Sequence, residues 1–298
     1  MNNKVATKVA TKVAIVTGAS SGIGAAAARR LHDRGYVVYA AARRIEKMAP
    51  LAEAGIRAMR LDVTDEASLS AFVSQVVSET GQIDVLVNNA GYGSLGALED
   101  VPMIEARRQF DVNLFGAARL VQLVVPHMRE QRGGRIINIS SIGGRIHLPL
   151  CGWYHATKFA IEGFSDTLRM ELAPFGIRVV VIVPGAIDTE WHSVAGDNLI
   201  ATSGTGTYGS QAAALVRVLS AGGLASPPEV IADAIVRAAQ ARRPHTRYRV
   251  GLGAKPVLVS RWALPDKAFD SMVRVVLGVG SRVAGSPPVV KMSAGRAS

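Results

Sequence analysis

The chain has 298 residues, of which 49% are hydrophobic and 19% are charged. This length and apolar fraction predict a folded chain with a substantial core and exclude a mainly disordered one. The single cysteine, Cys151, excludes an intrachain disulfide and a cysteine-rich zinc site, and we expect no metal. Residues 1–12 lack the apolar core of a secretory signal, and no apolar run reaches the ~18 residues of a transmembrane helix. We therefore expect a cytoplasmic protein.

The positive charge is concentrated in one part of the chain. The net charge is +11, and residues 237–298 hold 12 basic and two acidic residues, a net +10. A nearly neutral body with a basic end argues against nucleic-acid binding, which a strongly basic chain would otherwise suggest.

Apolar segments rich in β-branched residues alternate with helical patterns. The predicted strands are 13–17, 36–40, 56–61, 83–87, 135–139, 177–183 and 248–251. The predicted helices are 23–34, 65–79, 101–131, 154–172 and 227–241. Strands that are apolar throughout, and that helices separate, form a parallel sheet covered on both faces. The sequence predicts a doubly wound α/β domain, a Rossmann fold with about seven strands.

Three parts are expected along the chain: an N-terminal tail at 1–11, one Rossmann-fold domain at 12–253, and a basic C-terminal helical extension at 254–298. We expect disorder in the last residues, 284–298. Residues 196–226, rich in Gly, Ser, Thr and Ala, have the composition of a mobile segment. The extension mixes aliphatic residues and Trp262 with basic residues. It is either an interfacial helix pair that attracts anionic lipid or, as we favour, helices packed on the domain or on a second subunit.

A glycine-rich turn follows the first predicted strand and opens the first predicted helix. Its glycines are Gly18, Gly22 and Gly24. Glycine permits a tight turn and lets backbone N–H groups approach a pyrophosphate at the N-terminus of a helix. This pattern at the first strand of a βαβ unit predicts a dinucleotide site.

The end of the second predicted strand indicates which dinucleotide binds. In place of a carboxylate for the ribose hydroxyl, the chain has Arg43 and Arg44. A guanidinium beside the ribose favours a 2′-phosphate, to which Ser20 can add a hydroxyl donor. We predict NADP(H) rather than NAD(H). The alternative is that both arginines are solvated loop residues.

These features occur together with a series of motifs. The motifs are Thr17-Gly-x-x-x-Gly-x-Gly24, Asp62-Val63, Asn88-Asn-Ala-Gly91, Asn113, Ser141, Tyr154-x-x-x-Lys158, and Pro184-Gly185 with Thr189. With them the chain resembles the short-chain dehydrogenase/reductase family, in its roughly 250-residue branch. The arginine-ended strand and the segment Arg243-Pro-x-x-Arg247-Tyr248 are similar, more narrowly, to the 17β-hydroxysteroid and retinol dehydrogenase side of the family.

The resemblance implies cofactor contacts from several segments, with Asp62 on the adenine amino group and Val63 packed beside it. The predicted cofactor residues are Gly18, Ser20, Ser21, Gly22, Ile23, Gly24, Arg43, Arg44, Asp62, Val63, Asn89, Ala90, Gly91, Tyr154, Lys158, Pro184, Gly185, Ile187 and Thr189. The last four hold the nicotinamide end in the family. The resemblance also implies a homodimer or homotetramer that pairs through the helices at 101–131 and 154–172.

Four residues match the catalytic tetrad of that family: Asn113, Ser141, Tyr154 and Lys158. Tyr154 and Lys158 lie four residues apart on a predicted helix and face the same way, and a nearby ammonium lowers the pKa of a tyrosine. We predict that Tyr154 is the general acid in reduction and the general base in oxidation, while Ser141, not its neighbour Ser140, donates to the substrate oxygen. The resemblance implies that Asn113 orders a water that links Lys158 to solvent.

Other polar residues near these motifs receive no catalytic role. His155 is turned by about 100° from Tyr154 on a helix, so we interpret it as structural or exposed. We expect His147 and His192 to be solvated, with substrate contact as the alternative. Cys151 is expected to be a small lining residue and not a nucleophile.

The predicted walls of the substrate site are mostly apolar. They are residues 92–98, 142–153 and 191–224, from which we single out Leu95, Leu148, Trp153 and Trp191. An apolar cleft favours a steroid, a retinoid, a long-chain aldehyde or an aromatic ketone. We predict an NADP(H)-dependent oxidoreductase that interconverts a hydrophobic ketone or aldehyde and its alcohol. The alternatives are a non-catalytic NADP(H) sensor and, against the charge distribution, a nucleic-acid binder.

Overall fold

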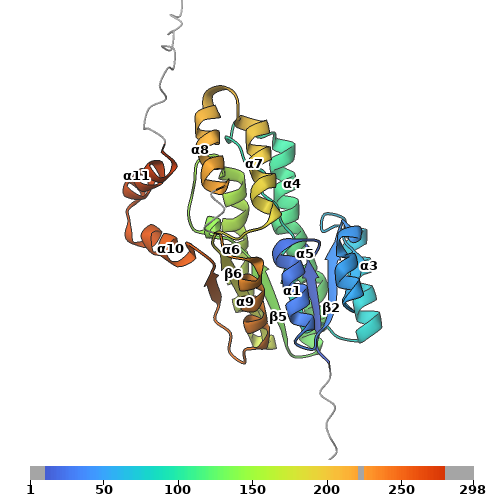
Figure 1. Cartoon of the computed structure of the whole chain (residues 1–298). Helices are drawn as coiled ribbons and strands as arrows, with labels where there is room; N and C mark the ends of the chain where they lie inside the picture. Colours follow the sequence, from blue (N-terminus) through green and yellow to red (C-terminus); the bar gives the residue numbers. More distant parts are fainter. Residues whose placement is uncertain (1–10, 221–224, 279–298) are drawn as a thin grey trace, which may run out of the picture.

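The computed structural model describes residues 11–220 and 225–278, which form a parallel sheet with helices on both faces (Figure 1). The strands are β1 (Val13–Thr17), β2 (Val37–Ala42), β3 (Arg57–Arg60), β4 (Val85–Asn88), β5 (Gly134–Ile139), β6 (Ile177–Pro184) and β7 (Arg247–Val250). Their order in the sheet is β3-β2-β1-β4-β5-β6-β7. The predicted seven-stranded Rossmann fold is confirmed, with strand ends shifted by a few residues.

The strand order reverses between β1 and β4. The chain runs outward from β1 through β2 to β3, returns to β4 on the other side of β1, and continues to β7. In open α/β sheets a ligand binds at such a switch point, beyond the carboxyl ends of the strands. The glycine turn after β1 and the segment after β4 both lie there.

The two faces of the sheet are covered by separate helix layers. In β1, Ala14 and Val16 pack into one core cluster, while Val13 and Ile15 pack into the other. The first layer contains α1 (Gly22–His32), α2 (Ala49–Glu53) and α9 (Pro228–Gln240). The second contains α3 (Glu66–Thr80), α5 (Gly116–Glu130) and α6 (Gly152–Leu172). Burial of both strand faces explains why the strands are apolar throughout.

A third cluster of buried side chains lies apart from the two sheet faces. It joins the loops after β4 and β5 to α7 (Glu190–Ser203), α8 (Gly209–Ser220) and α11 (Asp266–Leu277). The segment 196–226, whose composition suggested mobility, contains the end of α7 and all of α8, in which Leu199, Ala212 and Leu215 are buried. Residues 221–224 lie outside the described residues, as do residues 1–10 of the tail predicted at 1–11 and the segment 284–298, for which disorder is predicted.

The C-terminal extension begins with α10 (Ala254–Ala263) and continues into α11, next to α8 in Figure 1. Phe269, Val273 and Leu277 of α11 are buried in the third cluster, so this helix packs on the domain. Trp262 of α10, in contrast, is 87% exposed. Within the described residues, no helix is both long and apolar enough to cross a membrane.

The single helix predicted at 101–131 is interrupted. It consists of α4 (Met103–Phe110), a π-helical turn η2 (Asp111–Phe115) and α5. A π turn changes the backbone hydrogen-bond register, and such turns are frequent at functional sites. The remaining short helices are η1 (Ile45–Met48), η3 (Ile142–Gly144), η4 (Ala173–Phe175) and η5 (Gly206–Tyr208). Asn113 lies in the π turn.

Candidate active site

The glycine turn has the geometry that its sequence predicts. Gly18 and Gly22 adopt left-handed backbone conformations, with φ of +65° and +52°. A Cβ on Gly24 would lie 2.3 Å from the Gly18 carbonyl oxygen, so only glycine fits. The Asn89 side chain donates to the Thr17 carbonyl at 2.9 Å and fastens the turn to the segment after β4. The N-terminus of α1, with Ser21 as its first flanking residue, is therefore held at the switch point.

The residues present fit a dinucleotide. A side chain on Gly22 would lie 3.0 Å from the Thr189 methyl group, so the segment after β6 closes on the glycine turn from the other side. Pro184 ends β6, the Gly185 N–H donates to the Val250 carbonyl at 2.9 Å, and Thr189 caps α7. Small residues thus surround the start of α1 where a pyrophosphate needs backbone N–H groups.

The arginines at the end of β2 lie on the same side as the turn. Arg44 Nη2 donates to Ser20 Oγ at 3.3 Å, so the two groups predicted to hold a 2′-phosphate converge. Arg43 is exposed and its charge acts on Asp62. The sequence reasoning missed Glu190, whose carboxylate lies 3.8 Å from Arg44 and 3.3 Å from Lys47.

Asp62 follows β3 and is fixed by its own loop. Its Oδ1 accepts from the Thr64 N–H at 3.0 Å and from the Thr64 hydroxyl at 2.8 Å. Burial alone would raise the pKa of Asp62, but these bonds and the charge of Arg43 outweigh it and lower that pKa. Val63 beside it is buried. Asp62 is therefore an oriented, ionised acceptor.

Ser141 and Tyr154 are brought together at the carboxyl end of β5. The Ser141 hydroxyl lies close enough to Tyr154 to lower the pKa of that tyrosine, and Ser141 Oγ accepts from the Gly143 N–H at 3.0 Å. The rival Ser140 is buried, and its Oγ has no partner among the described residues. The structure thus places Ser141, and not Ser140, at the tyrosine.

The pKa of Tyr154 differs from the expectation. Burial raises it to about 12, and the Ser141 hydrogen bond only partly opposes this effect. The Lys158 ammonium is 5.8 Å from the centre of the Tyr154 ring and donates to the Ile139 carbonyl at 3.0 Å. Contrary to the prediction, the pKa of Tyr154 is raised and not lowered, because loss of water around the hydroxyl outweighs the groups that oppose it.

Lys158 is itself buried in the site. Burial lowers its pKa to about 8, while the nearby Glu162 carboxylate acts in the opposite direction. At neutral pH Lys158 is therefore protonated in most molecules and holds a positive charge beside Tyr154. A buried lysine with such a shift is typical of a functional site.

Asn113 holds the segment after β4 against α6. Its Nδ2 donates to the Tyr92 carbonyl at 2.9 Å and to Thr157 Oγ1 at 3.1 Å, and its Oδ1 accepts from the Tyr92 N–H. A Cβ on Gly91 would lie 3.2 Å from Asn113 Oδ1 and 3.7 Å from Lys158 Nζ. All four tetrad residues thus gather at one place, although their chemical roles stay predictions.

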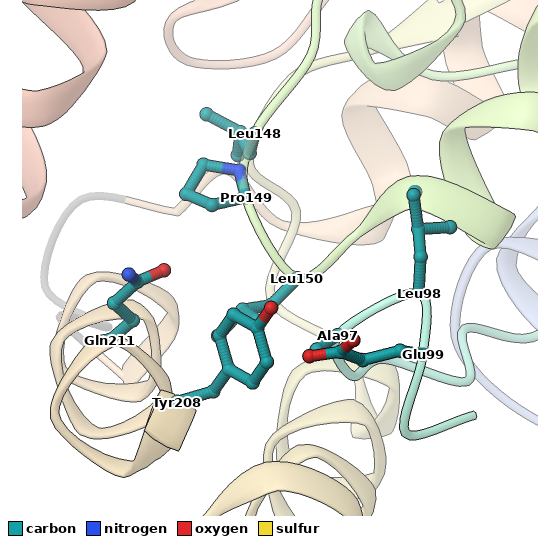
Figure 2. Close-up of a pocket in the computed structure, with 9 residues that line it drawn as sticks. Ala97, Leu98, Glu99, Leu148, Pro149, Leu150, Tyr208 and Gln211 are labelled. Atoms are coloured by element: carbon teal, nitrogen blue, oxygen red, sulfur yellow. The ribbon is translucent and has the colours of Figure 1, made fainter. Parts of the chain in front are cut away.

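The four predicted substrate residues lie in different surroundings. The Trp191 ring is 5.1 Å from that of Tyr154, so it lies directly on the site. Leu148 lines a cavity of about 320 Å³, together with Leu98, Pro149, Leu150, Tyr208 and other residues. Leu95 is 1% exposed within the third cluster, and Trp153 Nε1 is buried. Figure 2 shows Glu99 and Tyr208 together on one side of the cavity, away from Leu148 and Pro149.

The unassigned residues also have defined places. Burial raises the pKa of Cys151 to about 12, which leaves a protonated, unreactive thiol. His147 bonds Asp270 of α11 at 2.8 Å and its ring lies 5.2 Å from Phe269, so it joins the β5 side of the site to the extension. Burial also lowers the pKa of His192. His155 is buried and bonded, as described below.

Two groups have structural roles that the sequence motifs did not predict, because they act through distant partners. Asn88 donates to Asn138 Oδ1 at 2.9 Å, and Asn138 donates to Ser165 Oγ at 2.8 Å, a buried chain that ties β4 and β5 to α6. Thr17 Oγ1 accepts the N–H groups of Asn89 and Ala90, both at 3.0 Å. The only available signal was polar residues inside apolar strands.

Comparisons with known proteins identify the family of the chain. The family model described as short chain dehydrogenase matches residues 12–199. The chain belongs to the short-chain dehydrogenase/reductase family. It is 35% identical to the 3-ketodihydrosphingosine reductase of Bacteroides thetaiotaomicron, covering 90% of this chain and 98% of that one. The narrower resemblance to hydroxysteroid and retinol dehydrogenases stays a prediction.

Solved structures of the family superpose on this dehydrogenase. A short-chain dehydrogenase from Streptomyces avermitilis has a TM-score of 0.76 at 33% identity, covering 91% of this chain and 98% of that one. A metagenomic short-chain oxidoreductase in complex with NADP has a TM-score of 0.63 at 30% identity, covering 80% and 95%. The protein is therefore an oxidoreductase that acts on CH–OH or C=O groups with a nicotinamide cofactor.

Proposed function

We propose that this enzyme uses NADP(H) to interconvert a hydrophobic ketone or aldehyde and its alcohol, with Tyr154 as the general acid and base. The observation that carries the proposal is the group formed by Ser141, Tyr154 and Lys158 beside the Trp191 ring. Tyr154 can donate a proton, Ser141 can donate a hydrogen bond to an oxyanion, and Lys158 is a buried cation. Together with the apolar Trp191 ring beside them, these groups form the arrangement that carbonyl reduction requires.

The bound cofactor would supply or accept the hydride, and the chain's own residues handle the proton. With a pKa raised to about 12, Tyr154 keeps its proton at neutral pH and gives it to the substrate oxygen as negative charge develops there. Ser141 Oγ accepts the Gly143 N–H, which leaves the serine hydroxyl hydrogen to donate to that same oxygen. The Lys158 cation stabilises the phenolate that forms.

The preference for NADP(H) over NAD(H) rests on Arg43, Arg44 and Ser20. Arg44 and Ser20 already share a hydrogen bond at the end of β2, so a phosphate there would meet a positioned guanidinium and a hydroxyl. Arg44→Ala should weaken NADPH binding without weakening NADH binding. Equal losses for both cofactors, measured by fluorescence titration, would remove this part of the proposal.

The hydrophobic substrate class rests on the walls of the site. Leu148, Pro149 and Leu150 line one cavity, and Trp191 covers Tyr154. The relative from Bacteroides thetaiotaomicron is named as a reductase of 3-ketodihydrosphingosine, so a long-chain ketone belongs among the first compounds to try. Apolar walls with few charged groups favour such compounds over sugars and acids.

The decisive experiment follows NADPH oxidation by fluorescence across a panel from short aldehydes to steroid and long-chain ketones, with NADH in parallel. We expect NADPH-dependent turnover that Tyr154→Phe abolishes. Tyr248→Phe makes the same chemical change on β7 and should keep the activity. Tight NADPH binding without turnover on any compound would support the alternative, a non-catalytic NADP(H) sensor.

Self-association is proposed through the outer face of α5 and α6. Phe115, Phe159 and Met170 are 57%, 48% and 73% exposed there, more apolar surface than a solvated helix pair needs. We propose a homodimer or homotetramer that covers this face. Sedimentation of Phe159→Glu should give a smaller species than the wild-type chain, whereas an unchanged mass would refute this interface.

We propose a cytoplasmic enzyme, with peripheral membrane contact as the competing hypothesis for the C-terminal extension. The packed inner face of α11 favours a role within the protein, while the exposed Trp262 and the basic Lys255 and Lys267 favour anionic lipid. Flotation with anionic vesicles compares the full chain with Trp262→Glu. Binding by the wild-type chain alone would support membrane contact, and absence of binding by both would refute it.

A further inference from the structure

His155 spans the loop that carries Ser141. This β5 loop, residues 140–151, connects β5 to α6. The imidazole is 7% exposed, with Nδ1 2.7 Å from the Gly143 carbonyl oxygen and Nε2 3.1 Å from the Leu148 backbone nitrogen. One side chain of α6 therefore holds the loop at two points, at Gly143 and at Leu148.

The two partners define the tautomer of His155. The Leu148 N–H only donates, so Nε2 must offer a lone pair, and the Gly143 carbonyl only accepts, so Nδ1 must carry the hydrogen. A protonated imidazole has no acceptor and would lose the bond to Leu148. Burial lowers the pKa of His155, the Gly143 bond opposes this, and the neighbouring His147 lowers it further. The other ionisable group against the imidazole is Tyr154, at 6.0 Å between rings.

Gly143 connects His155 to the Ser141 hydroxyl. Gly143 accepts from His155 at its carbonyl and donates from its N–H to Ser141 Oγ at 3.0 Å. A Cβ on Gly143 would lie 2.8 Å from His155 Nδ1 and 3.3 Å from Tyr154 Cε1, so the backbone approaches both rings closely. A chain of hydrogen bonds thus runs from His155 through Gly143 to Ser141, whose hydroxyl acts on the neighbouring Tyr154.

We propose that neutral His155 is a positioning residue that sets the direction of the Ser141 hydroxyl. By holding the Gly143 peptide, it makes the Gly143 N–H occupy a lone pair of Ser141 Oγ. The serine hydrogen is then left to point at the substrate oxygen. His155 touches no reacting atom in this scheme. The inference rests on the proposed function only for its effect on the rate, because the hydrogen-bond arrangement stands without it.

The kinetic test compares two substitutions at this position. His155→Leu keeps an apolar side chain but loses both bonds, and we expect kcat for ketone reduction to fall by roughly 10- to 100-fold. His155→Gln has both a donor and an acceptor and should recover most of that loss. NADPH affinity should change little in either variant, because His155 contacts the β5 loop, whereas the predicted phosphate and adenine contacts lie on the glycine turn and after β2 and β3. His245→Gln, at an exposed position, serves as the control.

A double substitution separates positioning from a general structural role. If His155 acts through Ser141, His155→Leu should cost little further in a Ser141→Ala background. Losses that multiply, a glutamine variant as poor as the leucine variant, or lost NADPH affinity would each overturn the proposal. The non-additive result together with rescue by glutamine would support it.

A second measurement does not depend on turnover. In nitrogen-15 NMR of the full chain, the histidine signal that disappears in His155→Gln should show a hydrogen on Nδ1 and none on Nε2 at neutral pH. The opposite tautomer or a doubly protonated ring would overturn the proposal. If the wild-type enzyme reduces no ketone, the proposed function fails, while this spectrum still decides whether His155 holds the loop as inferred.

Discussion

The buried ammonium of Lys158 should make the stability of the protein depend on pH in a predictable direction. Burial lowers the pKa of Lys158 in the folded protein to about 8 from an ordinary value of 10.5. This difference between the folded and the ordinary pKa corresponds to about 3 kcal/mol, since each pKa unit is worth about 1.4 kcal/mol. This is the penalty for holding the charged form in the fold.

The sign follows from proton counting. Below the folded pKa both states hold the proton, so the penalty is constant. Between the folded pKa of about 8 and the unfolded value of 10.5, the unfolded chain binds more protons, so folding stability rises with pH. Above the unfolded value the ammonium penalty is gone.

Urea unfolding of the wild-type chain and of Lys158→Met across this window gives the measurement. We expect the wild-type free energy of unfolding to gain about 3 kcal/mol on the methionine variant as the pH rises from below 8 to 10.5. Comparison of the two chains cancels the other titrating groups. Lys267→Met removes an exposed ammonium and serves as the control. Parallel stability curves for wild type and Lys158→Met would refute the argument, because they would mean that the ammonium stays hydrated.

Three other substitutions test separate parts of the structure. Gly24→Ala places a methyl group 2.3 Å from the Gly18 carbonyl and should weaken NADPH binding by at least roughly 100-fold in a fluorescence titration. Glu162→Gln removes the buried carboxylate that Arg145 and Arg247 share, while both keep Asp166, and should cost about 1–3 kcal/mol in urea unfolding. Phe269→Ala removes the support of the His147 ring and should raise KM more than it lowers kcat in steady-state assays. If Phe269→Ala had the KM of the wild type, α11 would not influence the substrate site.

The sheet and the glycine turn could be predicted because their signals are local. A fully apolar strand such as Val13–Thr17 can only be buried on both faces, and three glycines at its end leave few alternatives to a tight turn. Tyr154 and Lys158 share a helix face by their spacing alone, and the structure places Lys158 beside the Tyr154 ring and Tyr154 beside Ser141.

The remaining features depend on groups that are distant in sequence or on solvent exclusion. Spacing shows that His155 points away from Tyr154, but not that Gly143 and Leu148 present a carbonyl and an N–H to it. The pKa of Tyr154 depends on how much water the folded site admits, which no motif encodes. The helices α7 and α8 were hidden because glycine and serine lower helix propensity, while burial of Leu199 and Leu215 outweighs it.

Helix α6 combines chemistry and positioning on one rigid element. Tyr154 and Lys158 share the face that we propose for the cofactor, while His155 and Glu162, seven residues apart and so two turns along, contact the β5 loop. His155 holds the loop backbone, and Glu162 accepts from Arg145 of the same loop at 2.7 Å. Any displacement of the helix therefore carries the loop with it, and the distance from Ser141 to Tyr154 is preserved. A long helix that carries both pairs of residues can keep this geometry, whereas a flexible loop alone could not.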